Sequence, residues 1–174
     1  MIGRTFAASI LIAAAVGSWS PLQAADKGPF SGRSLRSVTG ATIALDDSLA
    51  KGPVLLDFWA TWCRPCEHSL PALERLHQRA RERGISVVGV SIDGPRNWAR
   101  VRPFAARLGL TFPIVIDEDG SLARRFKVQA VPTSVLIAQD GRIVRTHSGF
   151  HPAEEDSLRA AVDALLGDVQ PGAH

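Results

Sequence analysis

Two cysteines stand where a predicted buried strand meets a predicted helix, and this junction constrains the fold more than any other feature of the chain. Residues 54–59 form an almost continuous apolar run, which is typical of a central strand covered on both faces. Residues 64–83 carry apolar side chains at helical spacing and predict an amphipathic helix. Cys63 and Cys66 lie where these segments join. We therefore expect both thiols at the N-terminal end of a helix that follows a buried strand.

The rest of the chain alternates between strand and helix patterns. Apolar runs predict strands at residues 85–92, 112–116, 133–137 and 142–147, and alternation around Gly40 predicts a hairpin or edge strand at 38–45. Helical spacing predicts helices at residues 98–108, 121–126 and 153–166. A chain of 174 residues is long enough for one compact domain. The order predicts an α/β fold with a central mixed sheet flanked by helices, parallel at the start and antiparallel at the end.

The N-terminal segment has the three-part pattern of an export signal. Arg4 precedes an apolar run at residues 6–16, and Leu22-Gln23-Ala24 ends in a small residue that suits cleavage. We expect residues 1–24 to be a signal peptide, with an uncleaved membrane anchor as the alternative. Whether it is a cleaved signal peptide or an uncleaved anchor, this segment places the folded part in a periplasmic or other extracytoplasmic compartment, where disulfides persist.

The remaining boundaries follow from composition. Residues 25–36 are rich in Gly, Ser and charged side chains, which predicts a linker. We expect the folded domain at residues 37–167 and a C-terminal tail at residues 168–174. The formal net charge is only +3, and the basic residues are scattered along the chain. This distribution indicates a solvated surface and argues against nucleic-acid binding.

The cysteine spacing favours redox chemistry over a structural role. A bridge between Cys63 and Cys66 closes a very short loop and removes little entropy from the unfolded chain. A closed zinc site needs four ligands, and the sequence has neither a second cysteine pair nor a suitably spaced histidine pair. We therefore predict neither a metal nor an organic cofactor.

The predicted helix assigns different tasks to the two thiols. Unpaired backbone N–H groups at a helix N-terminus stabilise a thiolate, so Cys63 is the predicted nucleophile. Cys66, further into the helix, is the predicted resolving thiol that attacks a mixed disulfide on Cys63. Pro65 stiffens the first turn. Arg64 either lowers the pKa of the thiol and makes the pair more oxidising, or points into solvent with a screened effect.

The run from Val54 to Cys66, which ends in Trp59-Ala60-Thr61-Trp62-Cys63-Arg64-Pro65-Cys66, resembles the active-site strand and turn of thioredoxins. Within that superfamily it is most similar to the exported TlpA/ResA-like branch, which also has a leading hairpin and an extra helix and strand, here at residues 95–117. The resemblance covers residues 37–166. It implies a thioredoxin-like fold with an N-terminal hairpin and a helix-strand insertion.

The resemblance also implies roles for residues outside the cysteine pair. Val131-Pro132-Thr133 resembles the cis-proline loop that receives extended substrate beside the disulfide, so Pro132 and Val131 are candidate site residues. Asp57 matches the buried acid that exchanges protons with the resolving thiol, and its apolar surroundings should raise its pKa. Trp62, together with Arg64 and Pro65, is expected to contact substrate.

One position departs from the exported branch. Members commonly carry a glutamate three residues after the second cysteine, and this chain has Ser69 there. A serine cannot take up a proton as a carboxylate does. Proton handling is therefore expected to rest more heavily on Asp57, and the assignment of branch-specific substrates is weakened.

We expect reversible exchange of the Cys63-Cys66 dithiol with protein thiols and disulfides, in the direction of a reductase. The resemblance implies a membrane thiol-disulfide electron donor and a substrate such as apocytochrome c, and we expect a monomer. An oxidase or isomerase is the first alternative, and a copper-binding module the second. A thiol peroxidase is the third alternative. Its motif places a threonine three residues before the reactive cysteine and a proline four residues before that threonine. In this chain Thr61 lies only two residues before Cys63, and the residue four before Thr61 is Asp57.

Overall fold

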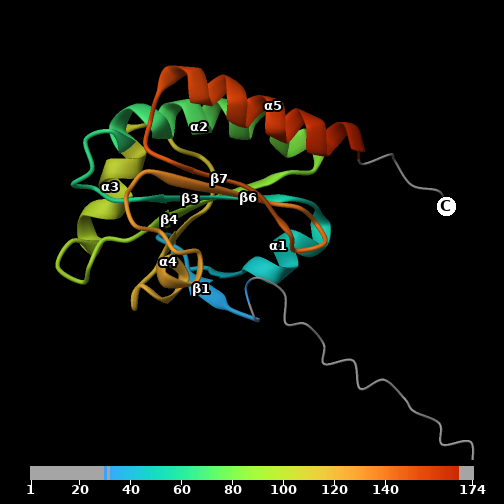
Figure 1. The fold of residues 1–174 in the computed structure, drawn as a ribbon. Coiled ribbons are helices and arrows are strands. Elements are labelled where there is room, and N and C mark those ends of the chain that lie inside the picture. The colour runs from blue at the N-terminus through green and yellow to red at the C-terminus, as the bar shows by residue number, and fades with distance from the viewer. Residues whose placement is uncertain (1–29, 31, 169–174) are drawn as a thin grey trace, which may run out of the picture.

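The computed structural model describes residues 30 and 32–168, which contain a central five-stranded mixed sheet with helices on both faces (Figure 1). The strand order is β5-β4-β3-β6-β7, with β3 in the middle. β3 runs parallel to β4 and antiparallel to β6, while β4 and β5 are parallel and β6 and β7 antiparallel. The strands are β3 (Val54–Trp59), β4 (Ser86–Ser91), β5 (Ile114–Ile116), β6 (Thr133–Ile137) and β7 (Ile143–Ser148). The predicted mixed sheet is confirmed.

The helices form two layers around this sheet. α2 (Cys66–Ala80) and α5 (Pro152–Asp168) lie on one face, and α1 (Leu45–Lys51) and α4 (Ser121–Arg125) lie on the other (Figure 1). α3 (Trp98–Arg107) buries Val101 and Ala105 in the same core cluster as α2. The insertion expected at residues 95–117 consists of α3 and β5.

Strand alternation divides the side chains of β3 between two cores. Leu55 and Trp59 join the cluster under α2, while Val54, Leu56 and Phe58 join the cluster on the opposite face. Side chains alternate along a strand, so Asp57 points to the α2 face with Leu55 and Trp59. All six residues of β3 are buried, as the apolar run predicts.

The N-terminal hairpin corrects one predicted boundary. β1 (Ser34–Arg36) pairs antiparallel with β2 (Thr42–Ala44), so the linker prediction for residues 25–36 is wrong at its last three positions. These residues carry no apolar run because the strand is short and two of its three side chains are exposed. The predicted signal peptide and the last six residues of the predicted tail lie outside the described residues.

Helix α1 was not predicted from the sequence. It has seven residues and buries only Leu45 and Leu49, so its periodic pattern is too short to be distinguished from a loop. The predicted helix at 64–83 is α2, which begins two residues later and ends in a short 3-10 turn at Arg81–Arg83. Within residues 30 and 32–168, no helix combines the length and the apolar character needed to cross a membrane.

A close backbone approach at Gly52 sets the start of β3. A Cβ atom on Gly52 would lie 2.1 Å from the carbonyl oxygen of Gly84, which precedes β4. We expect Gly52→Ala to lower the free energy of unfolding by about 2 kcal/mol, because backbone must move to relieve the clash. Urea denaturation measures this change.

Gly94→Ala is the matched control, since a Cβ atom there meets nothing within 4 Å. Its free energy of unfolding should stay within about 0.5 kcal/mol of the wild-type value. Equal stability of the two variants would contradict the proposed close approach.

Candidate active site

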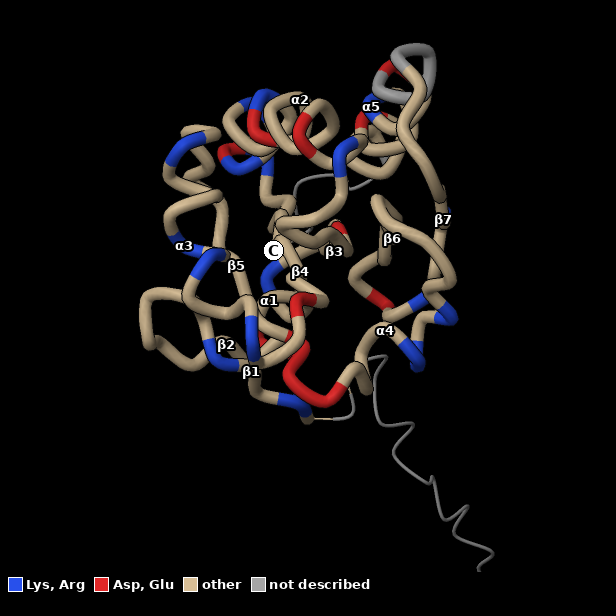
Figure 2. Tube along the Cα trace, turned by 90° about the vertical axis from the view of Figure 1, so that its left-hand side faces the viewer, with Lys and Arg blue, Asp and Glu red and all other residues tan. Residues whose placement is uncertain are grey.

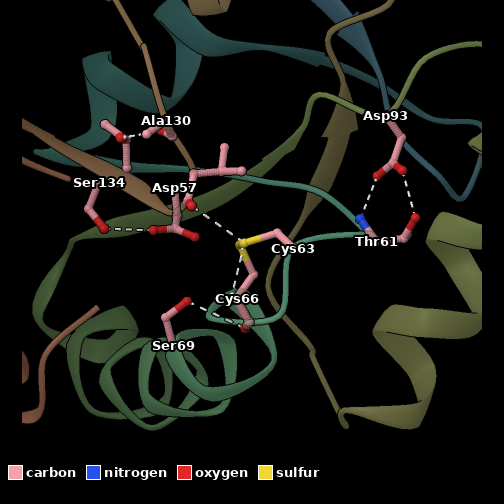
Figure 3. Close-up of a disulfide and its surroundings, with 10 residues drawn as sticks. Asp57, Thr61, Cys63, Cys66, Ser69, Asp93, Ala130 and Ser134 are labelled. Atoms are coloured by element: carbon pink, nitrogen blue, oxygen red, sulfur yellow. Dashed lines mark hydrogen bonds between the residues drawn. A yellow bond between two sulfur atoms is a disulfide. The ribbon is translucent and has the colours of Figure 1, made fainter. Parts of the chain in front are cut away.

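The turn between β3 and α2 holds Cys63 and Cys66 in a disulfide (Figure 3). Cys66 is the first residue of α2 and is fully buried, whereas Cys63 is 5% exposed. The backbone N–H of Cys66 donates to Cys63 Sγ over 3.2 Å. A thiolate on Cys63 would receive the same bond and the positive end of the helix dipole. The geometry therefore suits Cys63 as the accessible sulfur and Cys66 as the shielded one.

The loop before β6 packs directly against the disulfide. The Val131-Pro132 peptide bond is cis, as the resemblance to thioredoxins implies. The carbonyl oxygen of Val131 lies 3.5 Å from Cys63 Sγ, so the loop and the disulfide share one surface (Figure 3). The carbonyl of Pro132 accepts a bond from the backbone N–H of Gly149 over 2.8 Å. This bond ties the loop to the end of β7.

Asp57 is buried on the α2 side of β3, with 2% of its surface exposed. Its Oδ1 accepts a 2.6 Å hydrogen bond from the hydroxyl of Ser134, and its Oδ2 has no hydrogen-bond partner. Figure 3 shows the carboxyl group between Ser134 and the cysteines. Burial raises the pKa of Asp57 to about 7, although the Ser134 hydrogen bond acts in the opposite direction. The raised pKa expected from the sequence is confirmed.

Ser69 stands on α2 one turn after Cys66. Its hydroxyl donates to the backbone carbonyl of Cys66 over 3.4 Å, and it lines the same pocket as Asp57. A hydroxyl bound to its own helix contributes no charge to this pocket. Asp57 is the only carboxyl group among the described residues that line it.

The two tryptophans of the motif have separate environments. Trp62 is 61% exposed beside the disulfide turn, together with the exposed side chains of Arg64 and Pro65. Trp59 is fully buried and stacks on Phe104, with ring centroids 5.4 Å apart. Trp62 therefore lies at the surface and Trp59 in the core. Contact of Trp62, Arg64 or Pro65 with substrate remains a prediction.

Asp93 holds the loop before Cys63 and was not identified from the sequence. It is 1% exposed and follows β4. Its carboxylate accepts bonds from the backbone N–H of Thr61 over 2.9 Å and from the Thr61 hydroxyl over 2.6 Å (Figure 3). The hydroxyl of Ser91 donates to the same carboxylate over 2.9 Å. An acid directly after a predicted buried strand was the available signal, because parallel strands end at one edge of a sheet.

Comparison with known proteins places this arrangement in a family. The sequence model of the AhpC/TSA family matches residues 29–146. The chain belongs to this family. Among individual proteins, the thiol-disulfide oxidoreductase ResA of Halalkalibacterium halodurans is 36% identical over 115 residues, which cover 66% of this chain and 64% of that protein. The match thus spans slightly less than two thirds of the relative's length.

Solved structures of similar proteins have the same fold. A Chlorobium tepidum protein named as the thiol:disulfide interchange protein DsbE is 32% identical with a TM-score of 0.71, and the match covers 78% of this chain and 93% of that one. A thioredoxin-like protein from Porphyromonas gingivalis is 27% identical with a TM-score of 0.68, covering 82% and 94%. The AhpC/TSA chain described here therefore has the thioredoxin-like fold that its cysteine motif implies.

Burial of Asp57 makes stability depend on pH. In the folded state Asp57 stays protonated up to its raised pKa of about 7, whereas in the unfolded chain Asp57 ionises above its ordinary pKa of 3.8. Asp57 therefore costs no stability below pH 4, and stability is lost as the pH rises to 7. We expect Asp57→Asn to be more stable than the wild type at pH 8, by on the order of 4 kcal/mol.

Denaturation of the oxidised chain between pH 4 and pH 8 measures this difference. The gain in the variant should grow across that interval and level off above pH 7. Asp47→Asn, which alters an exposed carboxyl group, is the control. An equal gain in both variants, or a gain that does not change with pH, would count against a buried acid with a raised pKa.

Proposed function

We propose that this protein is an enzyme that exchanges its Cys63-Cys66 disulfide with the thiols and disulfides of other proteins. The observation that carries the proposal is a disulfide at the N-terminus of α2, in which Cys63 is slightly exposed and Cys66 fully buried, with a cis-proline loop against Cys63. The names of the matched ResA and DsbE proteins support this activity. The chemistry needs two thiols and a proton acceptor, and we propose no metal or organic cofactor.

In the reductive direction, the Cys63 thiolate attacks one sulfur of a substrate disulfide. The substrate S–S bond breaks, one substrate thiolate leaves, and Cys63 is joined to the other substrate sulfur. Cys66 then gives its proton to Asp57 and attacks Cys63 Sγ, so the second substrate thiolate leaves and the Cys63-Cys66 disulfide forms. The substrate gains two electrons from the enzyme. Its two thiolates take up protons from water.

The surface around Cys63 suits an extended polypeptide. Trp62, Arg64 and Pro65 are exposed beside Cys63, and Val131 presents its carbonyl on the other side. An exposed indole is a strong apolar anchor for binding. We propose these four residues as the docking surface, with Pro132 shaping the loop.

The surroundings of Thr61 count against a peroxidase. A peroxidase of this fold needs a threonine hydroxyl beside its reactive cysteine, but the Thr61 hydroxyl is bound to Asp93. Asp93 holds this hydroxyl through a short bond and holds the Thr61 backbone as well. The observed hydrogen bonds therefore favour disulfide exchange over peroxide reduction within this family.

We propose the reductase direction, with a membrane thiol-disulfide donor supplying electrons and a protein such as apocytochrome c receiving them. The N-terminal export pattern supports a periplasmic or other extracytoplasmic location, either as a cleaved protein or as an anchored one. An oxidase or isomerase is the alternative direction. Lys and Arg are spread over several elements, and on α2 they are interspersed with Asp and Glu (Figure 2). This distribution favours protein substrates over nucleic acid. We also propose that the protein is a monomer.

Variants of the two cysteines test the activity. Cys63→Ser should abolish reduction of insulin disulfides by the full chain, because no accessible thiol remains. Cys66→Ser should instead accumulate a mixed disulfide on Cys63, visible as a mass increase that dithiothreitol reverses. The two variants control for each other, since both remove one thiol. A wild-type chain that turns over no disulfide, or a Cys66→Ser chain that forms no adduct, would overturn the proposal.

Asp57→Asn tests the proton acceptor separately. The reduced chain is mixed with an excess of dithiobis(nitrobenzoate), which releases one coloured thiolate when Cys63 attacks and a second when Cys66 resolves. We expect the second release to slow about 100-fold at neutral pH, because Cys66 loses its base. Asp117→Asn changes an aspartate that is also buried but binds the backbone of α4. An unchanged second release in Asp57→Asn would remove Asp57 from the mechanism.

A further inference from the structure

A pocket of about 50 Å3 lies beside Asp57, between the sheet and helices α2 and α5. Much of its described lining is apolar, including Leu73 and Leu76 of α2. One water needs only about 15 Å3, so the pocket has room for a few of them. A proton accepted by Asp57 must pass through this pocket or return to the cysteines. The polar side chains of the pocket therefore decide how readily the proton leaves Asp57 and frees the Cys66 thiolate for its attack on Cys63 Sγ.

Three polar residues form a row across three neighbouring strands. Asp57 on β3 pairs with Ser134 on β6, and Ser134 pairs with His147 on β7. Side chains of directly paired residues point to the same face of a sheet, with Cβ atoms about 5 Å apart. All three residues line the pocket. The row runs from the buried centre of the sheet to its edge strand.

The two oxygens of Asp57 face different neighbours. Oδ1 is bound to Ser134, and Oδ2 has no hydrogen-bond partner and lies on the side of the cysteines (Figure 3). A thiol proton can therefore arrive at Oδ2. Rotation about the Cβ–Cγ bond, which has a broad torsional preference, brings that proton to the serine side.

Ser134 can serve both protonation states of the acid. A hydroxyl group both donates and accepts hydrogen bonds. It donates to the carboxylate, and it can accept from the protonated acid at the same 2.6 Å separation while its own hydrogen turns into the pocket. Ser134 can thus conduct the proton as well as support the carboxylate.

His147 stands at the solvent end of the row. Its Nε2 lies 3.1 Å from the carbonyl oxygen of Gly149, and a carbonyl can only accept, so Nε2 carries the hydrogen. In the neutral ring Nδ1 is then the basic nitrogen. The residue is partly exposed, so a proton taken up on the ring can pass to solvent.

We propose that Ser134 and His147 carry the proton from Asp57 to solvent, making His147 the exit group of the exchange reaction. This inference rests on the proposed function. Cys66 gives its proton to Asp57 reversibly. Before Cys66 attacks Cys63 Sγ, the acid passes a proton to Ser134 as the serine hydroxyl gives its own, directly or through water, to His147. His147 then releases one proton to solvent. No electrons move along the row, and each group returns to its starting state.

The surroundings of the row are consistent with this direction. Among the described residues, the charged and titratable groups that line the pocket besides Asp57 are Arg79 of α2, His147 of β7, His151 after β7, and Arg159 of α5. The positive charge of Arg79 disfavours excess positive charge in the pocket, which promotes release of the proton, while the charge of Arg159 is partly offset by Asp156 at 2.8 Å.

His147→Gln tests the exit group, because glutamine can donate to the Gly149 carbonyl but cannot take up the proton. The reduced full chain is mixed with dithiobis(nitrobenzoate) at pH 7.5, and the two thiolate releases are followed by stopped-flow absorbance. We expect the first release to persist and the second to slow about tenfold. Added imidazole should restore the second release in the variant, since a soluble base can replace the missing ring.

His77→Gln is the matched control, because His77 lies on α2 against Phe112 and does not line this pocket. Ser134→Ala provides a second test on another residue and should also slow only the second release. Unchanged second releases in His147→Gln and Ser134→Ala would overturn the relay. A slowed release that imidazole does not restore would also overturn it and indicate a structural role. Loss of both releases in the wild-type chain would instead refute the proposed function.

Discussion

Pairing of β3 with β4 on one side and β6 on the other is the interaction on which the site depends. β3 leads directly into the disulfide turn, while the segments next to its two partners supply Asp93 and the Val131-Pro132 loop. Asp93 binds Thr61 just before the disulfide turn, and the Val131 carbonyl contacts Cys63 within it. The backbone ladder of the sheet therefore positions the reactive sulfur, and α2 supplies the N-terminal N–H groups that favour a thiolate.

Asp57 shows how the fold accommodates a costly group for the sake of chemistry. An acid in the middle of a fully buried strand destabilises the fold wherever it is ionised, and one hydrogen bond from Ser134 offsets only part of that cost. The same burial brings its pKa close to neutrality, where a proton acceptor is most effective. On α2, Ser69 stands where a glutamate is expected, so the acidic group beside the cysteines is Asp57 on β3.

Much of the fold and part of the site could be predicted from local patterns. Continuous apolar runs identified β3 and β6 well because buried strands leave a dense signal over five or six residues. β1 escaped because none of its three side chains is fully buried, and α1 because it buries only two. Ser134 and His147 escaped for another reason. Each is an ordinary polar residue in its own segment and becomes significant only through neighbours brought close by strand pairing.

The sequence by itself determined the chemistry available to this protein: two thiols three residues apart at a strand-helix junction, an acid within the strand, and a proline before a later strand. These signals are local, so residue type and spacing are sufficient to find them. The tertiary structure alone decided which groups meet. It placed Val131 against Cys63, fastened Thr61 to Asp93, and aligned Asp57 with Ser134 and His147. Such contacts depend on strand order and register, which arise from packing of the whole chain and leave no mark at any one position.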